Sequence, residues 1–295
     1  MEETSFEKTA SRLDSSRFGA RIISVRSVSS TNDLARQEAE KGAAEGTVVV
    51  AEEQTFGRGR LSRGWYSPPG LGIWMSVVLR PTLSPEAAPA LTFCASLAVA
   101  RAVKAAHGLD VTLKWPNDVL VKGKKLCGIL TEMKATRRSV EFVVCGIGMN
   151  VNHTLEDFPA ELRRSATSVL IASGRKADRV ALFAEVVRQL ELAYDRFSRE
   201  GASACIQEWR SMCPLFGKRV RIREDAGTGA ETGRRTRART RAGTKGKKRG
   251  TGLVVEGTFF DVESNGALVL RLDSGVHRTF VAGDVELVSQ ESEDP

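Results

Sequence analysis

The sequence has few residues of the kinds that bind metals or form disulfides. Its 295 residues include five cysteines and three histidines, and no two of the cysteines form a CxxC pair. These numbers and spacings exclude a zinc cluster and give no sign of a disulfide framework. Several of the cysteines lie in apolar runs, which is typical of buried, reduced thiols.

Signals for export, for membrane insertion and for the common nucleotide-binding loops are also missing. The N-terminal stretch "MEETSFEKTASRLDSS" is polar and lacks the apolar core of a signal peptide. No uncharged apolar run approaches the roughly 18 residues that span a bilayer. Neither GxxxxGKS/T nor GxGxxG occurs, so P-loop and Rossmann-type sites are not expected. We therefore expect a cytoplasmic protein.

Positive charge is concentrated in one segment. The net charge is +8, but residues 234–249, "RRTRARTRAGTKGKKR", carry nine basic side chains and no acidic one. Without these nine charges the rest of the chain has a net charge of −1, so the total describes this segment and not the fold. The segment is either a solvated loop or a weak, salt-dependent contact for polyanions.

Apolar periodicity predicts an α+β fold with two domains. Strands are expected at 21–28, 46–53, 72–79, 111–115, 118–133 and 140–152, and helices at 31–42, 85–107, 178–200 and 202–211. These elements predict a domain over 21–213, after a flexible leader at 1–20, with a mixed, mostly antiparallel sheet. Short strands then predict a small β-barrel at 217–290, interrupted by a disordered basic insert at 225–250.

A loop rich in arginine and glycine, "EEQTFGRGRLSRGW" (52–65), is the first candidate site. Gly57 and Gly59 let the backbone approach a ligand closely, and the nearby arginines suit phosphate or carboxylate groups. Trp65 can cover an apolar surface. This combination predicts a lid that orders when an anionic substrate arrives. A solvated basic loop or a nucleic-acid contact remains the alternative for the loop alone.

Three further stretches carry polar residues at the ends of predicted elements. In "KWPNDVLVKGKKLCGILTEM" (114–133), Asp118 could hold a magnesium ion that bridges nucleotide phosphates, although a hairpin with solvated lysines explains the same pattern. "SVSSTND" (27–33) places donors and acceptors at a helix start, where an N-cap is the ordinary explanation. "CGIGMNVN" (145–152) is a buried strand that ends in glycines and an amide.

The ordered set "SSTN", "QTxGRGRxxRxW", "KWPNDV", "KKLxGILxE" and "GIGMNVN" closely resembles the biotin protein ligases over about residues 25–152. The C-terminal module is similar to the SH3-like domain of that family. The resemblance implies a catalytic domain with the class II aminoacyl-tRNA-synthetase-like fold. It also implies a reaction in which ATP and Mg²⁺ convert biotin to biotinyl-5′-AMP. The biotinyl group then passes to one lysine of a biotin carboxyl carrier protein of the acetyl-CoA carboxylase type.

The resemblance also implies roles for individual residues. Those expected to contact biotin are Ser30, Thr31, Asn32, Gln54, Gly59 and Gly128. Those expected at the junction of the biotin carboxylate and the α-phosphate, and so in catalysis, are Arg58, Arg60 and Lys125, with Lys114 on the nucleotide side. Contacts to ATP are expected from Trp65, Asn117 and Asn150, and Asp118 is expected to face Mg²⁺. Many family members have a glycine where this chain has Ser62, which affects the expected flexibility of the lid.

Two alternatives follow from the same family. A lipoate–protein ligase is similar in fold and in its two-step chemistry, but lipoate has no ureido group for the polar residues at 30–32 and 54 to bind. A biotin-responsive DNA-binding repressor would carry an N-terminal helix-turn-helix domain. About twenty residues precede the first predicted strand, too few for three helices. We therefore expect a monofunctional ligase without sequence-specific DNA binding.

Overall fold

The structure is a computed structural model that describes residues 6, 17–223 and 253–288. The predicted basic insert at 225–250 lies outside the described residues, as does most of the predicted leader. The chain divides into two compact units. The first comprises Met1–Pro214 with Ser264–Gly266, and the second comprises Leu215–Glu263 with Ala267–Pro295.

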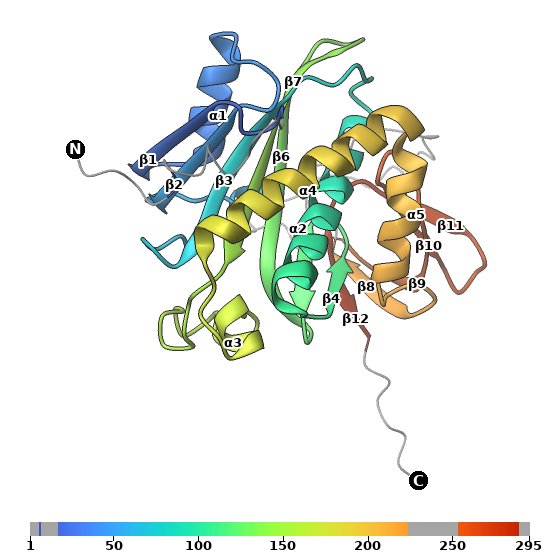
Figure 1. The fold of residues 1–295 in the computed structure, drawn as a ribbon. Coiled ribbons are helices and arrows are strands. Elements are labelled where there is room, and N and C mark those ends of the chain that lie inside the picture. Colours follow the sequence, from blue (N-terminus) through green and yellow to red (C-terminus); the bar gives the residue numbers. More distant parts are fainter. Residues whose placement is uncertain (1–5, 7–16, 224–252, 289–295) are drawn as a thin grey trace, which may run out of the picture. The chain divides into compact units, whose positions relative to one another are not determined.

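The first unit is built on a seven-stranded sheet with the order β1-β2-β3-β7-β6-β5-β4 (Figure 1). β1 and β2 are parallel, and every other pair is antiparallel. This arrangement confirms the predicted mixed, mostly antiparallel α+β fold. The strands are β1 Ile22–Val28, β2 Val48–Gln54, β3 Gly72–Leu79, β4 Val111–Lys114, β5 Asp118–Val121, β6 Lys124–Ala135 and β7 Val140–Asn150.

Five α-helices accompany this sheet among the described residues: α1 Thr31–Glu40, α2 Leu91–His107, α3 Val169–Ser173, α4 Arg179–Glu200 and α5 Ala202–Met212. α2 packs against α4 and against strands at the β7–β4 end of the sheet (Figure 1). α4 begins where the Asp178 carboxylate accepts hydrogen bonds from the backbone N–H groups of Val180 and Ala181. α5 follows directly after Gly201, whose φ of 77° ends α4.

The helix predicted at 85–107 begins later than expected. α2 starts at Leu91, and a short 3-10 turn, Ala88–Ala90, precedes it. Pro85 and Pro89 explain the difference, because proline lacks the N–H that a helix interior requires. By length and composition alone, Ala88–His107 could cross a membrane, but 78% of its most apolar window is buried inside the protein, as in a core helix.

α1 is held on the sheet by small side chains. Ala35 and Ala39 pack with Val78 of β3 and with Val144 of β7 in a buried cluster. Because α1 has two alanines at this spacing, its backbone can approach the strands closely. The first turn of α1, which begins at Thr31, therefore packs against β3 and β7, the central strands of the sheet.

The second unit is a five-stranded antiparallel sheet with the order β11-β10-β9-β8-β12. Its strands are β8 Arg219–Arg223, β9 Val254–Val262, β10 Leu268–Arg271, β11 His277–Phe280 and β12 Asp284–Leu287. The alternating burial of β8, with Val220 and Ile222 inside, gives the sheet one apolar face. The small C-terminal β domain expected from the sequence is thus confirmed.

His153 lies in a buried aromatic cluster just after β7. Its ring stacks on Phe158, with 4.8 Å between ring centroids and an interplanar angle of 11°, and meets the edge of Trp74. Neither ring nitrogen has a hydrogen-bond partner among the described residues. Burial lowers the pKa of His153 to about 4, against a smaller opposing effect of Asp157 and with a small contribution from Arg179.

We expect the free energy of unfolding to decrease as the pH falls from about 6.5 towards 4. Across this range the unfolded chain binds a proton on His153 that the folded protein excludes, at up to about 1.4 kcal/mol per pH unit. His153→Phe keeps a ring on Phe158 and should reduce this loss. Urea unfolding at pH 7 and pH 4.5 measures this loss, with His277→Phe, at an exposed position of β11, as the control. An equal loss in wild type and His153→Phe would contradict the assignment.

Candidate functional site

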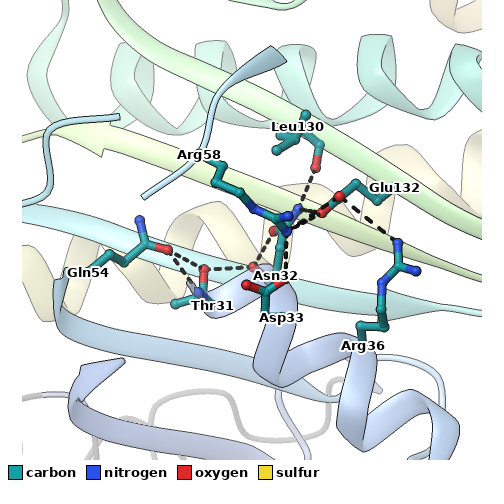
Figure 2. Close-up of polar contacts among 9 residues, drawn as sticks. Thr31, Asn32, Asp33, Arg36, Gln54, Arg58, Leu130 and Glu132 are labelled. Carbon is teal, nitrogen blue, oxygen red and sulfur yellow. Dashed lines mark hydrogen bonds and ion pairs between the residues drawn. The ribbon is translucent and has the colours of Figure 1, made fainter. Parts of the chain in front are cut away.

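A buried polar cluster lies at the first turn of α1 (Figure 2). Ser30 occupies the N-cap position and is buried, but its side chain does not cap the helix. The Gln54 Oε1 atom accepts hydrogen bonds from the Thr31 backbone N–H at 2.8 Å and from its hydroxyl at 3.1 Å. Ser76 of β3 lies 2.8 Å from the Thr31 hydroxyl and 2.7 Å from Asn32 Oδ1. An ordinary N-cap therefore does not explain these side chains.

The hydrogen bonds of Asn32 fix the orientation of its side-chain amide. Its Nδ2 donates to the Leu130 carbonyl at 3.2 Å and to Glu132 Oε2 at 2.7 Å (Figure 2). Its Oδ1 accepts from the Ser76 hydroxyl. Both N–H groups are used, whereas an amide oxygen can accept a second hydrogen bond. A Cβ at Gly146 of β7 would collide with Asn32 Oδ1. The site therefore offers a buried acceptor over a strand that has no side chain there.

Two more glycines form a flat floor next to this acceptor. Gly128 of β6 pairs with Gly148 of β7, and Trp65 lies over both. Gly148 is two residues from Gly146, so Trp65 and Asn32 lie over the same face of β7. The Trp65 Nε1 donor is buried and has no hydrogen-bond partner among the described residues. A buried donor without an acceptor costs about 1–3 kcal/mol, so this position suits a ligand that supplies the acceptor.

Lys125 brings positive charge to the same floor. Its Nζ lies 2.6 Å from Asp118 Oδ1 and 5.2 Å from the centre of the Trp65 ring. Lys125 lies on β6 and Asp118 on β5, and Asp118 pairs in register with Gly128. The ammonium group is thus held beside the glycine floor by a carboxylate from the neighbouring strand.

The backbone of Lys125 is fixed by a segment that the sequence did not single out. The Lys125 N–H donates to the Ser165 carbonyl at 2.8 Å, and its carbonyl accepts from the Thr167 N–H at 2.9 Å. Asn150 Nδ2 donates to the Thr167 carbonyl at 3.0 Å. Asn150, predicted to contact ATP, therefore positions the segment that holds Lys125.

The surroundings of Asp118 do not fit a metal site. Its Oδ1 atom faces the Lys125 ammonium at 2.6 Å, which would repel a cation at that oxygen. Across residues 6, 17–223 and 253–288, no group of three or more His, Cys, Asp or Glu residues could hold an ion. Asp118 is the counter-ion of Lys125.

The arginine and glycine loop forms a closed hairpin. Arg58 and Gly64 form an antiparallel bridge, the Gly59 N–H donates to the Arg63 carbonyl at 2.7 Å, and the Trp65 N–H donates to the Gly57 carbonyl at 2.8 Å. Leu61 has a φ of 59°, in the left-handed region. The loop therefore carries the Trp65 ring towards the floor on a backbone tied by its own hydrogen bonds.

The two loop arginines of the predicted site have different surroundings. Arg58 Nη2 lies 2.6 Å from Asp33 Oδ1 and 3.2 Å from Glu132 Oε2 (Figure 2). The Arg60 guanidinium carbon lies 6.0 Å from the centre of the Trp115 ring, within the range of a cation–π contact. Arg58 is bound to the protein near Asn32, and Arg60 lies near the turn that precedes β5.

The remaining predicted residues lie at the turn between β4 and β5. Asn117 Nδ2 donates to the Ile129 carbonyl at 2.7 Å, and the Ile129 N–H donates to the Asn117 carbonyl at 3.0 Å. Lys114 ends β4 and pairs in register with Asp118. Asn117 thus braces this turn against β6, and its contact with ATP stays a prediction.

The cysteines near the floor are not nucleophiles. Burial raises the pKa of Cys127, next to Gly128, far above its usual range, and raises that of Cys145 to about 12. Both thiols stay protonated at neutral pH, and only a thiolate attacks. All five cysteines are buried, whereas the sequence indicated burial for several of them.

Sequence reasoning missed three side chains of this site, in addition to the segment that holds the Lys125 backbone. Ser76 is a single serine in the otherwise apolar strand "GIWMSVVL", and that isolation was an available signal. Glu132 lies in a motif that was recognised but was given no role, and Asp33 directly follows Asn32. Both carboxylates matter because of contacts across the fold, which the sequence does not display.

Most of the chain is similar to known ligases of biotin or lipoate. The "Biotin/lipoate A/B protein ligase family" matches residues 24–150, and the "Biotin protein ligase C terminal domain" matches residues 248–288. The chain is 37% identical over 260 residues to the bifunctional ligase/repressor BirA of Bacillus subtilis, covering 88% of this chain and 72% of that protein. It is 36% identical over 203 residues to the biotin–[acetyl-CoA-carboxylase] ligase of Mycobacterium tuberculosis, covering 67% and 73%.

Two further matches concern the length of the chain relative to its relatives and the fold of the chain. The BirA protein of Bacillus spizizenii is 43% identical over 210 residues, and the chain spans 65% of that relative, slightly under two thirds. A biotin protein ligase from Aquifex aeolicus, solved in complex with biotin and ATP, has a TM-score of 0.69 at 23% identity. The match covers 91% of this chain and 99% of that one, and it shows the same fold.

We expect Gly148→Ala to displace the Trp65 ring, because a methyl group there would collide with the indole nitrogen. The overlap should destabilise the first unit by about 1–3 kcal/mol. The indole N–H signal of Trp65 in a proton–nitrogen NMR spectrum, assigned with Trp65→Phe, reports the displacement. Gly64→Ala in the same loop is the control, since a Cβ there meets no atom within 4 Å. An unshifted signal in Gly148→Ala would contradict this placement of Trp65.

Proposed function

Because this chain belongs to the biotin/lipoate A/B protein ligase family, as one of its biotin protein ligases, we propose that it biotinylates a carboxyl carrier protein of the acetyl-CoA carboxylase type. In this reaction biotin is first activated with ATP to biotinyl-5′-AMP. The names of the Mycobacterium tuberculosis relative and of a Paracoccus denitrificans relative support this acceptor class.

The observation that carries the choice of biotin is the polar cluster beside the glycine floor, in which Thr31, Asn32 and Ser76 are buried and Gln54 is half-buried. Asn32 Oδ1 can accept one more hydrogen bond, and the ureido ring of biotin carries N–H donors. The dithiolane ring of lipoate carries none, and would leave this second acceptor position of Asn32 Oδ1 unfilled. The cluster therefore favours biotin over lipoate.

In the first step, a carboxylate oxygen of biotin attacks the α-phosphorus of ATP, and pyrophosphate leaves. Both reactants are anionic, so the barrier falls when fixed positive charge lies between them. We assign this task to Lys125, which Asp118 holds beside the floor, and to Arg60 of the loop. Holding both groups in place also supplies the orientation that the in-line reaction needs.

In the second step, the amine of the acceptor lysine attacks the acyl carbon, and AMP leaves. The mixed anhydride also reacts with water, so the site has to exclude water until the acceptor arrives. Trp65, carried by the closed hairpin over Gly128 and Gly148, is the group we assign to this cover. The two steps need no protein nucleophile, in agreement with the protonated cysteines near the floor.

Two assays test the proposed function. Exchange of labelled pyrophosphate into ATP should depend on biotin and should not respond to lipoate. ATP-dependent incorporation of biotin into a purified carboxyl carrier domain should be lost when the acceptor lysine is changed to arginine. Exchange that depends on lipoate, or biotin incorporation that survives the loss of the acceptor lysine, would contradict the proposal.

We expect Lys125→Ala to reduce biotin-dependent pyrophosphate exchange by at least about 100-fold, because it removes the charge that offsets the two anions. Lys124→Ala changes the preceding, exposed lysine of the same strand and should leave the rate near that of wild type. Circular dichroism checks that both variants fold. Normal exchange in Lys125→Ala would rule out this role.

A further inference from the structure

We propose that Glu132 is a positioning residue that couples the amide of Asn32 to the loop arginine Arg58, so that recognition of the ligand ring and docking of the loop support each other. The inference rests on the proposed function for the identity of that ring. One carboxylate oxygen makes both contacts: Glu132 Oε2 lies 2.7 Å from Asn32 Nδ2 and 3.2 Å from Arg58 Nη2 (Figure 2). Glu132 Oε1 lies 3.4 Å from the same Nη2.

A second carboxylate binds the same arginine but not the amide. Asp33 Oδ1 lies 2.6 Å from Arg58 Nη2, closer than either oxygen of Glu132. Among the described residues, the hydrogen bonds of the Asn32 side chain go to Leu130, Glu132 and Ser76, and not to Asp33. Asp33 therefore acts on the loop alone, whereas Glu132 acts on the loop and on the ring-binding residue.

The positive charge of Arg58 is offset by its carboxylate partners, so Arg58 holds the loop in place. Arg36 Nη2 lies 4.0 Å from Glu132 Oε1, so two arginines and two carboxylates form a group that is neutral as a whole (Figure 2). A guanidinium with two carboxylates around one nitrogen has much of its charge offset. Lys125, with one carboxylate partner among the described residues, is better placed to offset the charge of an anionic ligand.

The coupling follows from shared hydrogen bonds. If a ligand N–H binds Asn32 Oδ1, it restrains the amide, and the restrained Nδ2 holds the Glu132 carboxylate in the position that Arg58 requires. Coupling between two sites is reciprocal, so the docked loop must in turn favour binding of the ring. The partial exposure of both carboxylates, 24% for Glu132 and 40% for Asp33, makes each contribution modest.

The loop half of the proposal is tested without any substrate. In the unliganded protein, Glu132→Gln and Asp33→Asn should each speed amide hydrogen exchange in residues 55–65 by about three- to tenfold, because each weakens the hold on Arg58. Glu40→Gln is the matched control, since Glu40 also lies on α1 but its contact is Lys134, 3.9 Å away. Unchanged exchange in both variants would overturn the proposal.

The coupling half is tested by two separate measurements on each variant: the dissociation constant for biotin by calorimetry, and the rate at which biotinyl-5′-AMP is released. Asp33→Asn should release the intermediate about three- to tenfold faster. It should lower biotin affinity less than Glu132→Gln does, because Asp33 acts on the ring only through the loop. Glu132→Gln should change both quantities by a similar factor, because it removes the negative charge that strengthens the contacts to Asn32 and to Arg58. When Asp33→Asn and Glu132→Gln are combined, the release rate of biotinyl-5′-AMP should increase by less than the product of the two single increases.

These outcomes separate the proposal from its premise. A purely structural role for Glu132 would lower stability without distinguishing it from Asp33 in the two measurements. Glu132→Gln with normal biotin affinity and faster release would limit Glu132 to the loop and would overturn the coupling. A wild-type protein that makes no biotinyl-5′-AMP would refute the proposed function, and the hydrogen-exchange result would still decide whether the two carboxylates hold the loop.

Discussion

The site depends on one contact, in which the Asn32 amide is buried over the bare backbone of Gly146. A buried amide is stable only when its donors are satisfied, and the Leu130 carbonyl and Glu132 do this for Asn32. Any side chain at position 146 would occupy the space of the Asn32 oxygen. The packing of α1 through Ala35 and Ala39 brings the first helical turn to this depth. The packing of α1, the glycine at position 146 and the hydrogen bonds of the amide thus all fix the position of Asn32 Oδ1.

The same sheet register assembles the rest of the floor. Because Gly148 lies opposite Gly128 and two residues after Gly146, three bare positions face the same side. Trp65 covers two of them, and Lys125 stands beside that ring. An apolar cover, a fixed cation and a buried acceptor therefore meet in a small space, although they come from segments up to about a hundred residues apart.

The sequence predicted a helix or strand accurately where the structure of a segment depends on its own residues. β3 was predicted at 72–79 and is Gly72–Leu79, because a continuous apolar run bounded by glycine is typical of a strand covered on both faces. The first turn of α1 was assigned to ligand binding by family resemblance, while its local pattern suggested only a cap. α3, with five residues, was missed because it is too short to show a helical period. The roles of Asp33, Glu132 and the segment 165–167 depend on contacts across the sheet, which a single sequence does not contain.

Leu61 is the feature of the loop with the widest consequence. Its left-handed backbone costs a leucine about 1 kcal/mol more than it would cost a glycine. The hairpin keeps this shape only while its hydrogen bonds and the ion pairs of Arg58 outweigh that cost. The apex residue thus reduces the stability of the hairpin, and a glycine there would lengthen the time that the loop spends in this shape.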